Sequence, residues 1–221
     1  MRNKKTHTPP LKGIVLILFI LFPITASAQQ PEFGIKGGLN LSTLTVEDAN
    51  DNNIIPGFHA GVFSKFMLTE KVALKPEVHF STKGVTSTYD QEFLGFDIAD
   101  GETTLNLGYI DIPVYIAYYL SEDFNFHIGP YAGILMNANL DTDAEILEFI
   151  QVNDAEEIDN SHFNRLDYGV SLGLGFEVEP VLFGFNYNLG LSQVAKEGEA
   201  MENLLGDAKN NVIQVYLGFS F

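Results

Sequence analysis

"LDYGVSLGLGFEVEPVLFGFNYNLGLSQ", residues 166–193, decides the fold. Bulky apolar residues occupy every second position on both sides of a turn around Pro180. The apolar set is Tyr168, Val170, Leu172, Leu174, Phe176 and Val178, followed by Val181, Phe183, Phe185, Tyr187 and Leu189. The alternate set is Asp167, Gly169, Ser171, Gly173, Gly175 and Glu177, followed by Gly184, Asn186, Asn188 and Gly190. A period of two is the strand period, so this stretch predicts an antiparallel hairpin with one apolar face.

The same period continues along most of the chain. It predicts eight strands, at about residues 33–42, 56–67, 72–84, 105–120, 124–137, 163–178, 181–192 and 211–221. Tight turns at residues 68–71, 121–123 and 177–180 alternate with long connections at 43–55, 85–104, 138–162 and 193–210. Short turns on one side and long loops on the other are typical of an outer-membrane barrel. We therefore predict an all-β fold, an eight-stranded antiparallel transmembrane β-barrel with long external loops and short periplasmic turns.

The apolar faces favour lipid outside the barrel. They run without a charge over nine to eleven residues, the length of a tilted strand that crosses a bilayer. Aromatic residues collect near the short-turn ends, with a smaller group near the long loops, as two interfacial girdles require. A soluble sandwich or lipocalin-like barrel would alternate too, with its apolar face inside, and stays open as an alternative.

Residues 1–28 predict a secretory signal peptide. Four basic residues precede the apolar run "IVLILFILFPITA" (14–26), and Ala28 ends a small-residue cleavage site. An N-terminal membrane anchor is the alternative, but Pro23 interrupts the run. The barrel domain is then predicted to span residues 29–221.

Composition excludes several classes of function. The formal charge is −17, and removal of the four basic residues of the signal leaves 8 basic residues against 29 acids, a charge of −21. Nucleic acid binding needs a basic surface, so it is excluded. The chain has no cysteine for a disulfide or thiolate site, and 12% aromatic residues argue against an acidic disordered chain. Nothing in the sequence predicts a cofactor.

Strand phasing directs a set of charged residues into the lumen. The predicted network consists of Lys36, Lys65, Lys75, Glu77, Lys83, Asp111, Arg165, Asp167 and Glu177. An eight-stranded barrel is filled by side chains, and buried charges require partners. We expect a structural ion-pair network, with Lys75 as the partner of Asp111.

A catalytic alternative concerns the third strand. Glu77, His79 and Ser81 share one strand face, the residue types of a hydrolase site. Residues two apart on a strand are about 7 Å apart, too far for the contacts of a triad without help from neighbouring strands. A lipid-modifying enzyme is therefore a minor alternative.

The predicted external loops hold 20 of the 29 acids, opposed only by Lys196 and Lys209. Asp141, Asp143 and Glu145 resemble the start of a calcium loop but lack its central glycine and terminal glutamate. They are weak metal candidates; a solvated anionic surface and divalent-cation bridging, between loops or to lipopolysaccharide, both stay open. The spacing of Ile146, Leu147 and Ile150 predicts a short helix at residues 144–152, which would cap the pore mouth or dock a partner.

Several segments resemble strands of the PorT-like outer-membrane β-barrel family. These are "FGIKGGLNLSTL" (33–44), "PGFHAGVFSKFML" (56–68), "KPEVHFSTKG" (75–84) and "YIDIPVYIAYYL" (109–120), the last holding an L-x-I-P-like signature at Ile110–Pro113. The resemblance implies the outer membrane of a Gram-negative-type bacterium. The run at 211–221 is then the last strand, expected to pair with the first, because an open edge in lipid leaves peptide groups unsatisfied.

Four functions are compatible with these features. The first is a small, plugged, non-enzymatic barrel whose acidic external loops serve surface interaction or envelope structure. The second is an accessory subunit of an envelope secretion or uptake complex, since one branch of the PorT-like family takes part in a secretion machine. A lipid-modifying enzyme and a narrow pore follow. Expected partners are outer-membrane lipid and lipopolysaccharide, an envelope protein, and divalent cations at the loops.

Overall fold

The computed structural model describes residues 31–45, 54–93, 96–146, 150–157, 163–196 and 207–221. The predicted signal peptide, residues 1–28, lies outside these residues and stays a prediction. The described part is built from strands: β1 (Glu32–Thr45), β2 (Ile55–Met67), β3 (Val72–Phe93), β4 (Phe96–Tyr119), β5 (Phe124–Ile146), β6 (Ile150–Glu157), β7 (Leu166–Val178), β8 (Val181–Gln193) and β9 (Lys209–Ser220). None of the described residues belongs to a helix that is long and apolar enough to cross a membrane.

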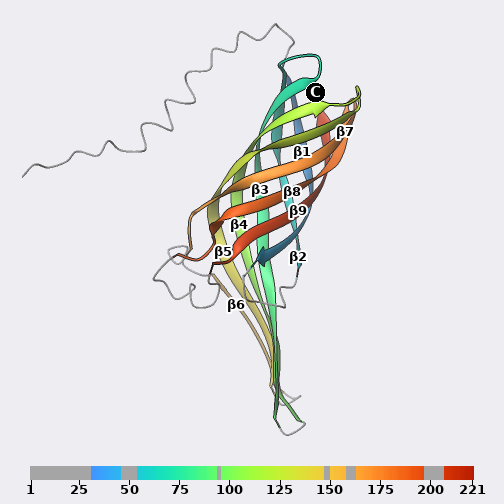
Figure 1. Ribbon diagram of the computed structural model, residues 1–221. Helices are drawn as coiled ribbons and strands as arrows, with labels where there is room; N and C mark the ends of the chain where they lie inside the picture. Colours follow the sequence, from blue (N-terminus) through green and yellow to red (C-terminus); the bar gives the residue numbers. More distant parts are fainter. Residues whose placement is uncertain (1–30, 46–53, 94–95, 147–149, 158–162, 197–206) are drawn as a thin grey trace, which may run out of the picture.

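Eight of these strands close into an antiparallel barrel (Figure 1). They follow the order β4-β3-β2-β1-β9-β8-β7-β5, and pairing of β4 with β5 completes the ring. The strand β9 lies between β8 and β1, and the N–H of Phe221 donates to the carbonyl of Phe33 (2.9 Å). The predicted eight-stranded closure, including the position of the last strand, is confirmed.

The apolar residues lie on the outer face of the barrel. Along β7 and β9, inward residues are buried and outward residues are exposed or half-buried in strict alternation. Leu39, Leu217 and Val215 are 67%, 62% and 56% exposed, and similar side chains surround the barrel. An apolar surface this continuous is unfavourable in water and favourable against lipid. The soluble alternative, with the apolar face inside, is therefore wrong.

Three barrel strands, β3, β4 and β5, continue past the barrel at the long-loop end, where β6 joins them (Figure 1). The pairing of β2 with β3 stops at His59 and Ser81, and β7 pairs with β5 only up to Leu166 and Ile134. Beyond these points β3, β4, β5 and β6 alone form an antiparallel sheet. We call this four-stranded extension the projecting sheet. Its existence was not predicted, because residues 85–104 and 138–157 were expected to be loops.

The helix predicted at residues 144–152 is wrong. The strand β5 runs to Ile146 and β6 starts at Ile150, and these two residues are Cα partners across a hairpin. Apolar residues four apart can lie on one helix face or opposite each other across a reversal of the chain. Pairing with β4 and β5 satisfies the backbone of this segment as strand.

The short-turn end has compact connections. The N–H groups of Leu68 and Thr69 donate to the carbonyl of Val72, and the Thr69 hydroxyl accepts from the N–H groups of Lys71 and Val72. Leu120 donates to the carbonyl of Phe124 across the next turn (2.9 Å). The predicted short turns at this end are confirmed, whereas the long connections predicted at 85–104 and 138–157 are largely strands of the projecting sheet.

Candidate functional site

The lumen holds most of the buried polar residues of the described chain, in layers along the barrel axis. At the short-turn end, Glu177 of β7 accepts hydrogen bonds from four neighbours. These are Lys75 of β3 (2.7 Å), Lys65 of β2 (3.0 Å), the hydroxyl of Tyr119 (2.8 Å) and the amide of Asn125 (2.9 Å). Five strands thus meet at one carboxylate, which binds opposite walls of the barrel together.

The next layer pairs Lys36 of β1 with Glu77 of β3. The ammonium lies 2.5 Å from Oε2 of Glu77, and both side chains are buried. The same ammonium lies 4.3 Å from the centre of the Tyr216 ring, a favourable cation–π distance. Burial of a lysine is costly unless the charge is paired, and here a carboxylate and an aromatic face both supply compensation.

A neutral layer of amides and imidazoles follows. The amide of Asn40 donates to the Ser81 hydroxyl (3.0 Å), and its Oδ1 lies 2.7 Å from Nδ1 of His59. Across the barrel, Nε2 of His127 lies 2.7 Å from Oδ1 of Asn186. These side chains are almost wholly buried, and their mutual hydrogen bonds satisfy polar atoms that would otherwise be costly in the interior.

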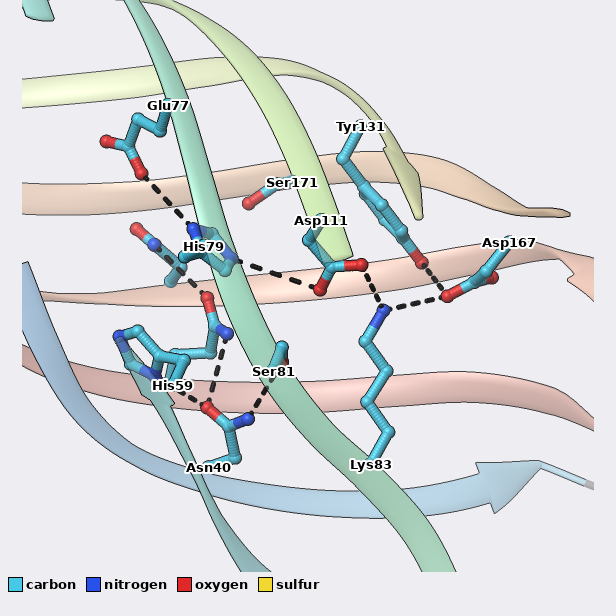
Figure 2. A network of polar contacts seen from close by, with 12 residues as sticks. Asn40, His59, Glu77, His79, Ser81, Lys83, Asp111, Tyr131, Asp167 and Ser171 are labelled. Atoms are coloured by element: carbon cyan, nitrogen blue, oxygen red, sulfur yellow. Dashed lines mark hydrogen bonds and ion pairs between the residues drawn. The ribbon is translucent and has the colours of Figure 1, made fainter. Parts of the chain in front are cut away.

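The third charged layer centres on Lys83 of β3 (Figure 2). Its ammonium lies 3.0 Å from Oδ1 of Asp111 on β4 and 2.8 Å from Oδ2 of Asp167 on β7. Asp167 also accepts from the Ser192 hydroxyl (2.8 Å) and the Asn210 amide (3.2 Å). One buried cation therefore pairs with two carboxylates. Asp167 accepts its remaining hydrogen bonds from neutral donors.

His79 lies between the second and third charged layers (Figure 2). Its Nδ1 is 3.9 Å from Oε2 of Glu77 and its Nε2 is 3.9 Å from Oδ2 of Asp111. These distances exceed those of direct hydrogen bonds. The imidazole separates two ion pairs without completing either.

An apolar layer completes the lumen toward the long-loop end. It is formed by Leu105, Leu107, Tyr109, Leu135, Ala138, Phe163, Val194 and Ala208, all buried. The Tyr109 ring of this layer also contacts the third charged layer: the Lys83 ammonium lies 4.6 Å from the centre of the ring. An apolar core of this kind excludes water from the charges beneath it.

Eight of the nine residues predicted for the lumen meet in these layers: Lys36, Lys65, Lys75, Glu77, Lys83, Asp111, Asp167 and Glu177. Lys65 also contacts Glu32 at the rim. Arg165 is the correction: it is exposed and lies on a bend before β7 begins at Leu166. Strand alternation does not apply there, so its sequence parity gave the wrong direction.

The predicted pair of Asp111 and Lys75 is also wrong. In the register of β3 and β4, Lys75 lies opposite Tyr115 and Asp111 lies opposite His79. Lys75 and Lys83 each stand four residues from His79 along β3, in opposite directions, so the register alone does not choose between them. The contacts across the lumen do: Lys75 binds Glu177, and Lys83 binds Asp111.

Phasing did not reveal every partner. Tyr119, Asn125, Ser192 and Asn210 complete the carboxylate shells and were not assigned to the network. Tyr119, Asn125 and Ser192 lie at inward positions of predicted strands, so the alternation along each strand is a signal that places them in the lumen. Asn210 precedes the predicted start of the last strand by one residue, and the observed strand includes it.

The weak metal candidates lie on β5 and not in a loop. Asp141 is exposed and accepts from the amide of Asn106 (3.0 Å). The side chains of Asp143 and Glu145 lie outside the described side chains. No group of three metal-ligating residues with suitable geometry occurs among the residues that the structure describes.

The catalytic alternative receives no geometric support. Ser81 and His79 are both buried, and the Ser81 hydroxyl accepts from Asn40. Within the described hydrogen bonds, none joins Ser81 to His79. The nucleophile and base of a hydrolase need such contact and access to substrate.

Fold and surface define a transmembrane β-barrel of the bacterial outer membrane. The chain belongs to a specific family of this class, the outer membrane protein beta-barrel domain, whose model matches residues 27–196. No curated protein sequence matches the chain significantly.

Solved outer-membrane proteins are similar to the chain. Ail, the attachment invasion locus protein of Yersinia pestis, is 13% identical with a TM-score of 0.44, over 87% of this chain and 100% of Ail. Neisserial surface protein A is 8% identical with a TM-score of 0.41, at the same coverages. OprG of Pseudomonas aeruginosa is 15% identical with a TM-score of 0.30, over 87% of this chain and 97% of OprG.

Proposed function

We propose that this protein is a plugged, non-enzymatic barrel that presents an acidic β-sheet at the cell surface for recognition of a cationic partner. The projecting sheet is the observation that carries the proposal. It extends the barrel wall outward and has two edges, β3 and β6, that pair on one side only within the described sheet. An unpaired edge offers backbone hydrogen bonds to another chain.

Charge gives the projecting sheet its chemistry. Residues 85–104 and 138–157 contain no lysine or arginine. Cα partners across the sheet include Asp90 with Asp100, Asp100 with Glu145, and Glu102 with Asp143. Like charges at directly opposite positions destabilise a sheet, and a basic segment or divalent cations would relieve that repulsion.

The lumen supports the non-conducting, non-enzymatic part of the proposal. Three charged layers, a neutral layer and an apolar layer fill the interior, and each charge has a partner of opposite sign. A pore would need a continuous aqueous path through these layers. A lipid-modifying enzyme would need its Ser81 to reach lipid, and that side chain is buried in the lumen.

Membership of an envelope complex is the second candidate, and it includes the PorT-like assignment. A hollow of about 590 Å³ at the periplasmic end favours it. Glu70, Lys71, Glu122 and Glu179 border this hollow, with Glu177 toward the lumen. A periplasmic partner with basic side chains would find complementary charge there.

A binding experiment separates the candidates. The folded protein in neutral-lipid nanodiscs is titrated with a basic peptide, and a variant carrying Asp100→Asn, Glu102→Gln, Asp143→Asn and Glu145→Gln is the comparison. We expect binding that weakens roughly tenfold or more in the variant, because four carboxylates are lost. Equal binding by both proteins contradicts surface recognition by the sheet. In-cell cross-linking that recovers a stoichiometric periplasmic protein would favour the complex instead.

A further inference from the structure

A hollow of about 610 Å³ lies on the outer surface at the external ends of β7, β8 and β9. Arg165 and Lys209 border it, together with Gln193 and the apolar side chains of Leu166, Tyr168 and Leu191. Two of the eight basic residues that follow the predicted signal peptide therefore border this hollow. We propose that this hollow binds the phosphate group of an outer-leaflet lipid, with Arg165 and Lys209 as its ligands.

The position of the hollow selects a membrane lipid. Leu166, Tyr168 and Leu191 are 54%, 49% and 49% exposed, on the lipid-facing side of β7 and β8. Lys209 begins β9 on the same outward face as Ile213 and Val215, which are exposed to lipid. The two cations thus stand at the boundary where the apolar surface ends. Acyl chains contact the apolar residues while the headgroup reaches the cations.

The two cations are available for a ligand. Every lysine of the lumen has a carboxylate partner, whereas among the described residues neither Arg165 nor Lys209 forms an ion pair. The planar guanidinium of Arg165 suits bidentate binding to phosphate oxygens, and Lys209 adds a point charge.

The wall of the hollow is fixed by hydrogen bonds. The amide of Asn164, next to Arg165, donates to the carbonyls of Gln193 (3.0 Å) and Ala195 (2.9 Å). Gln193 is the Cα partner of Lys209, and its amide donates to Asp207. These contacts hold the ends of the strands together, so the two cations are carried on an ordered rim. Asp207, two residues before Lys209, is engaged by the Gln193 amide and forms no ion pair with Lys209 among the described residues.

Phosphorylated lipid A is the ligand class that fits both parts of the hollow. It combines phosphate groups with acyl chains in the outer leaflet. Free inorganic phosphate shares the anionic chemistry but leaves the apolar residues without a partner. The projecting sheet is acidic and repels the same headgroups, so the hollow gives the barrel one side on which such a lipid is favoured.

Native mass spectrometry of the folded mature protein in neutral detergent tests the proposal. The probes are diphosphorylated lipid A, the same lipid without phosphates, and inorganic phosphate. The double variant Arg165→Gln, Lys209→Gln is compared with Lys71→Gln, which removes a cation from a periplasmic turn. Heat-modifiable migration of each variant in gel electrophoresis shows that the barrel has folded.

The expected result is binding of diphosphorylated lipid A that weakens roughly tenfold or more in the double variant and is unchanged in Lys71→Gln, because charge-assisted contacts are lost only in the former. The dephosphorylated lipid should bind the native protein as weakly as diphosphorylated lipid binds the double variant. Equal binding of diphosphorylated lipid A by the native protein and the double variant overturns the site. Displacement of the lipid by millimolar inorganic phosphate overturns the assignment to lipid and leaves a soluble-anion site.

Discussion

The ammonium of Lys83 lies 2.8 Å from Oδ2 of Asp167, although 84 residues separate them in the chain. Both side chains are buried, and they come from opposite parts of the barrel wall, β3 and β7. Closure of the barrel is what brings them together. Charge pairs of this kind tie non-neighbouring strands across the lumen, which backbone pairing alone does not do.

Replacement of Asp167 by asparagine should destabilise the barrel strongly. The substitution removes the carboxylate that accepts from Lys83, Ser192 and Asn210, while Asp111 still pairs with Lys83, and loss of a hydrogen bond to a charged group costs about 1.5–3 kcal/mol. Denaturant unfolding of the protein in lipid vesicles measures the change. Asp141→Asn is the matched control, because its carboxylate is exposed; an equal effect of both substitutions would contradict the account.

A double-mutant cycle should distinguish the true partner of Asp111. Asp111→Asn combined with Lys83→Met is expected to show a coupling energy of about 0.5–3 kcal/mol, because the two groups are in contact. The same carboxylate change combined with Lys75→Met should be additive within roughly 0.5 kcal/mol. Stronger coupling to Lys75 than to Lys83 would refute the observed pairing of Asp111 with Lys83.

Gly173 should not tolerate a side chain. A Cβ at this inward position of β7 would overlap Oδ1 of Asn186, the carbonyl of Phe185 and Nε2 of His127. Gly173→Ala is expected to lower the free energy of unfolding by about 1–3 kcal/mol through overpacking. Gly37→Ala provides the comparison, since its closest contact is a looser 3.1 Å to the carbonyl of His59. Stability of the Gly173 variant at or above that of the Gly37 variant would be inconsistent with the packing.

Calcium should protect the projecting sheet from proteolysis. Asp100 and Glu145 are Cα partners, as are Glu102 and Asp143, and a divalent cation reduces repulsion between such carboxylates. Limited proteolysis of the folded protein is compared in calcium and in sodium chloride of equal ionic strength. Slower cleavage in calcium is expected for the native protein and not for the variant Asp100→Asn, Glu102→Gln, Asp143→Asn, Glu145→Gln; identical rates in both salts would argue against cation bridging.

Alternation along the strands was sufficient to predict the barrel and its inward residues. A period of two assigns a face to Lys83 or Asp167 without knowledge of any other strand. It does not assign partners, because these depend on strand register and on contacts across the lumen. The inward faces of β3 and β4 therefore offer Asp111 both Lys75 and Lys83, four residues to either side of His79, and only the side-chain contact in the lumen identifies Lys83 as the partner.

Alternation also fails to predict where strands begin and end. Arg165 has inward parity but stands before the first residue of β7, where the chain bends outward. The projecting sheet does not follow from the sequence, because its acidic, polar segments carry no apolar alternation and its strands are defined by the backbone pairing. Ile146 and Ile150 are four residues apart, which is a helical spacing, but they face each other as a cross-strand pair.

Conductance across a planar lipid bilayer tests the central claim, that the lumen is closed, most directly. The purified, folded protein is inserted at known density in molar potassium chloride, with a general porin as the positive control. The layers around Glu177, Lys36 and Lys83 predict no conductance steps above the baseline. Reproducible single-channel steps that scale with the amount of inserted protein would contradict the plugged barrel.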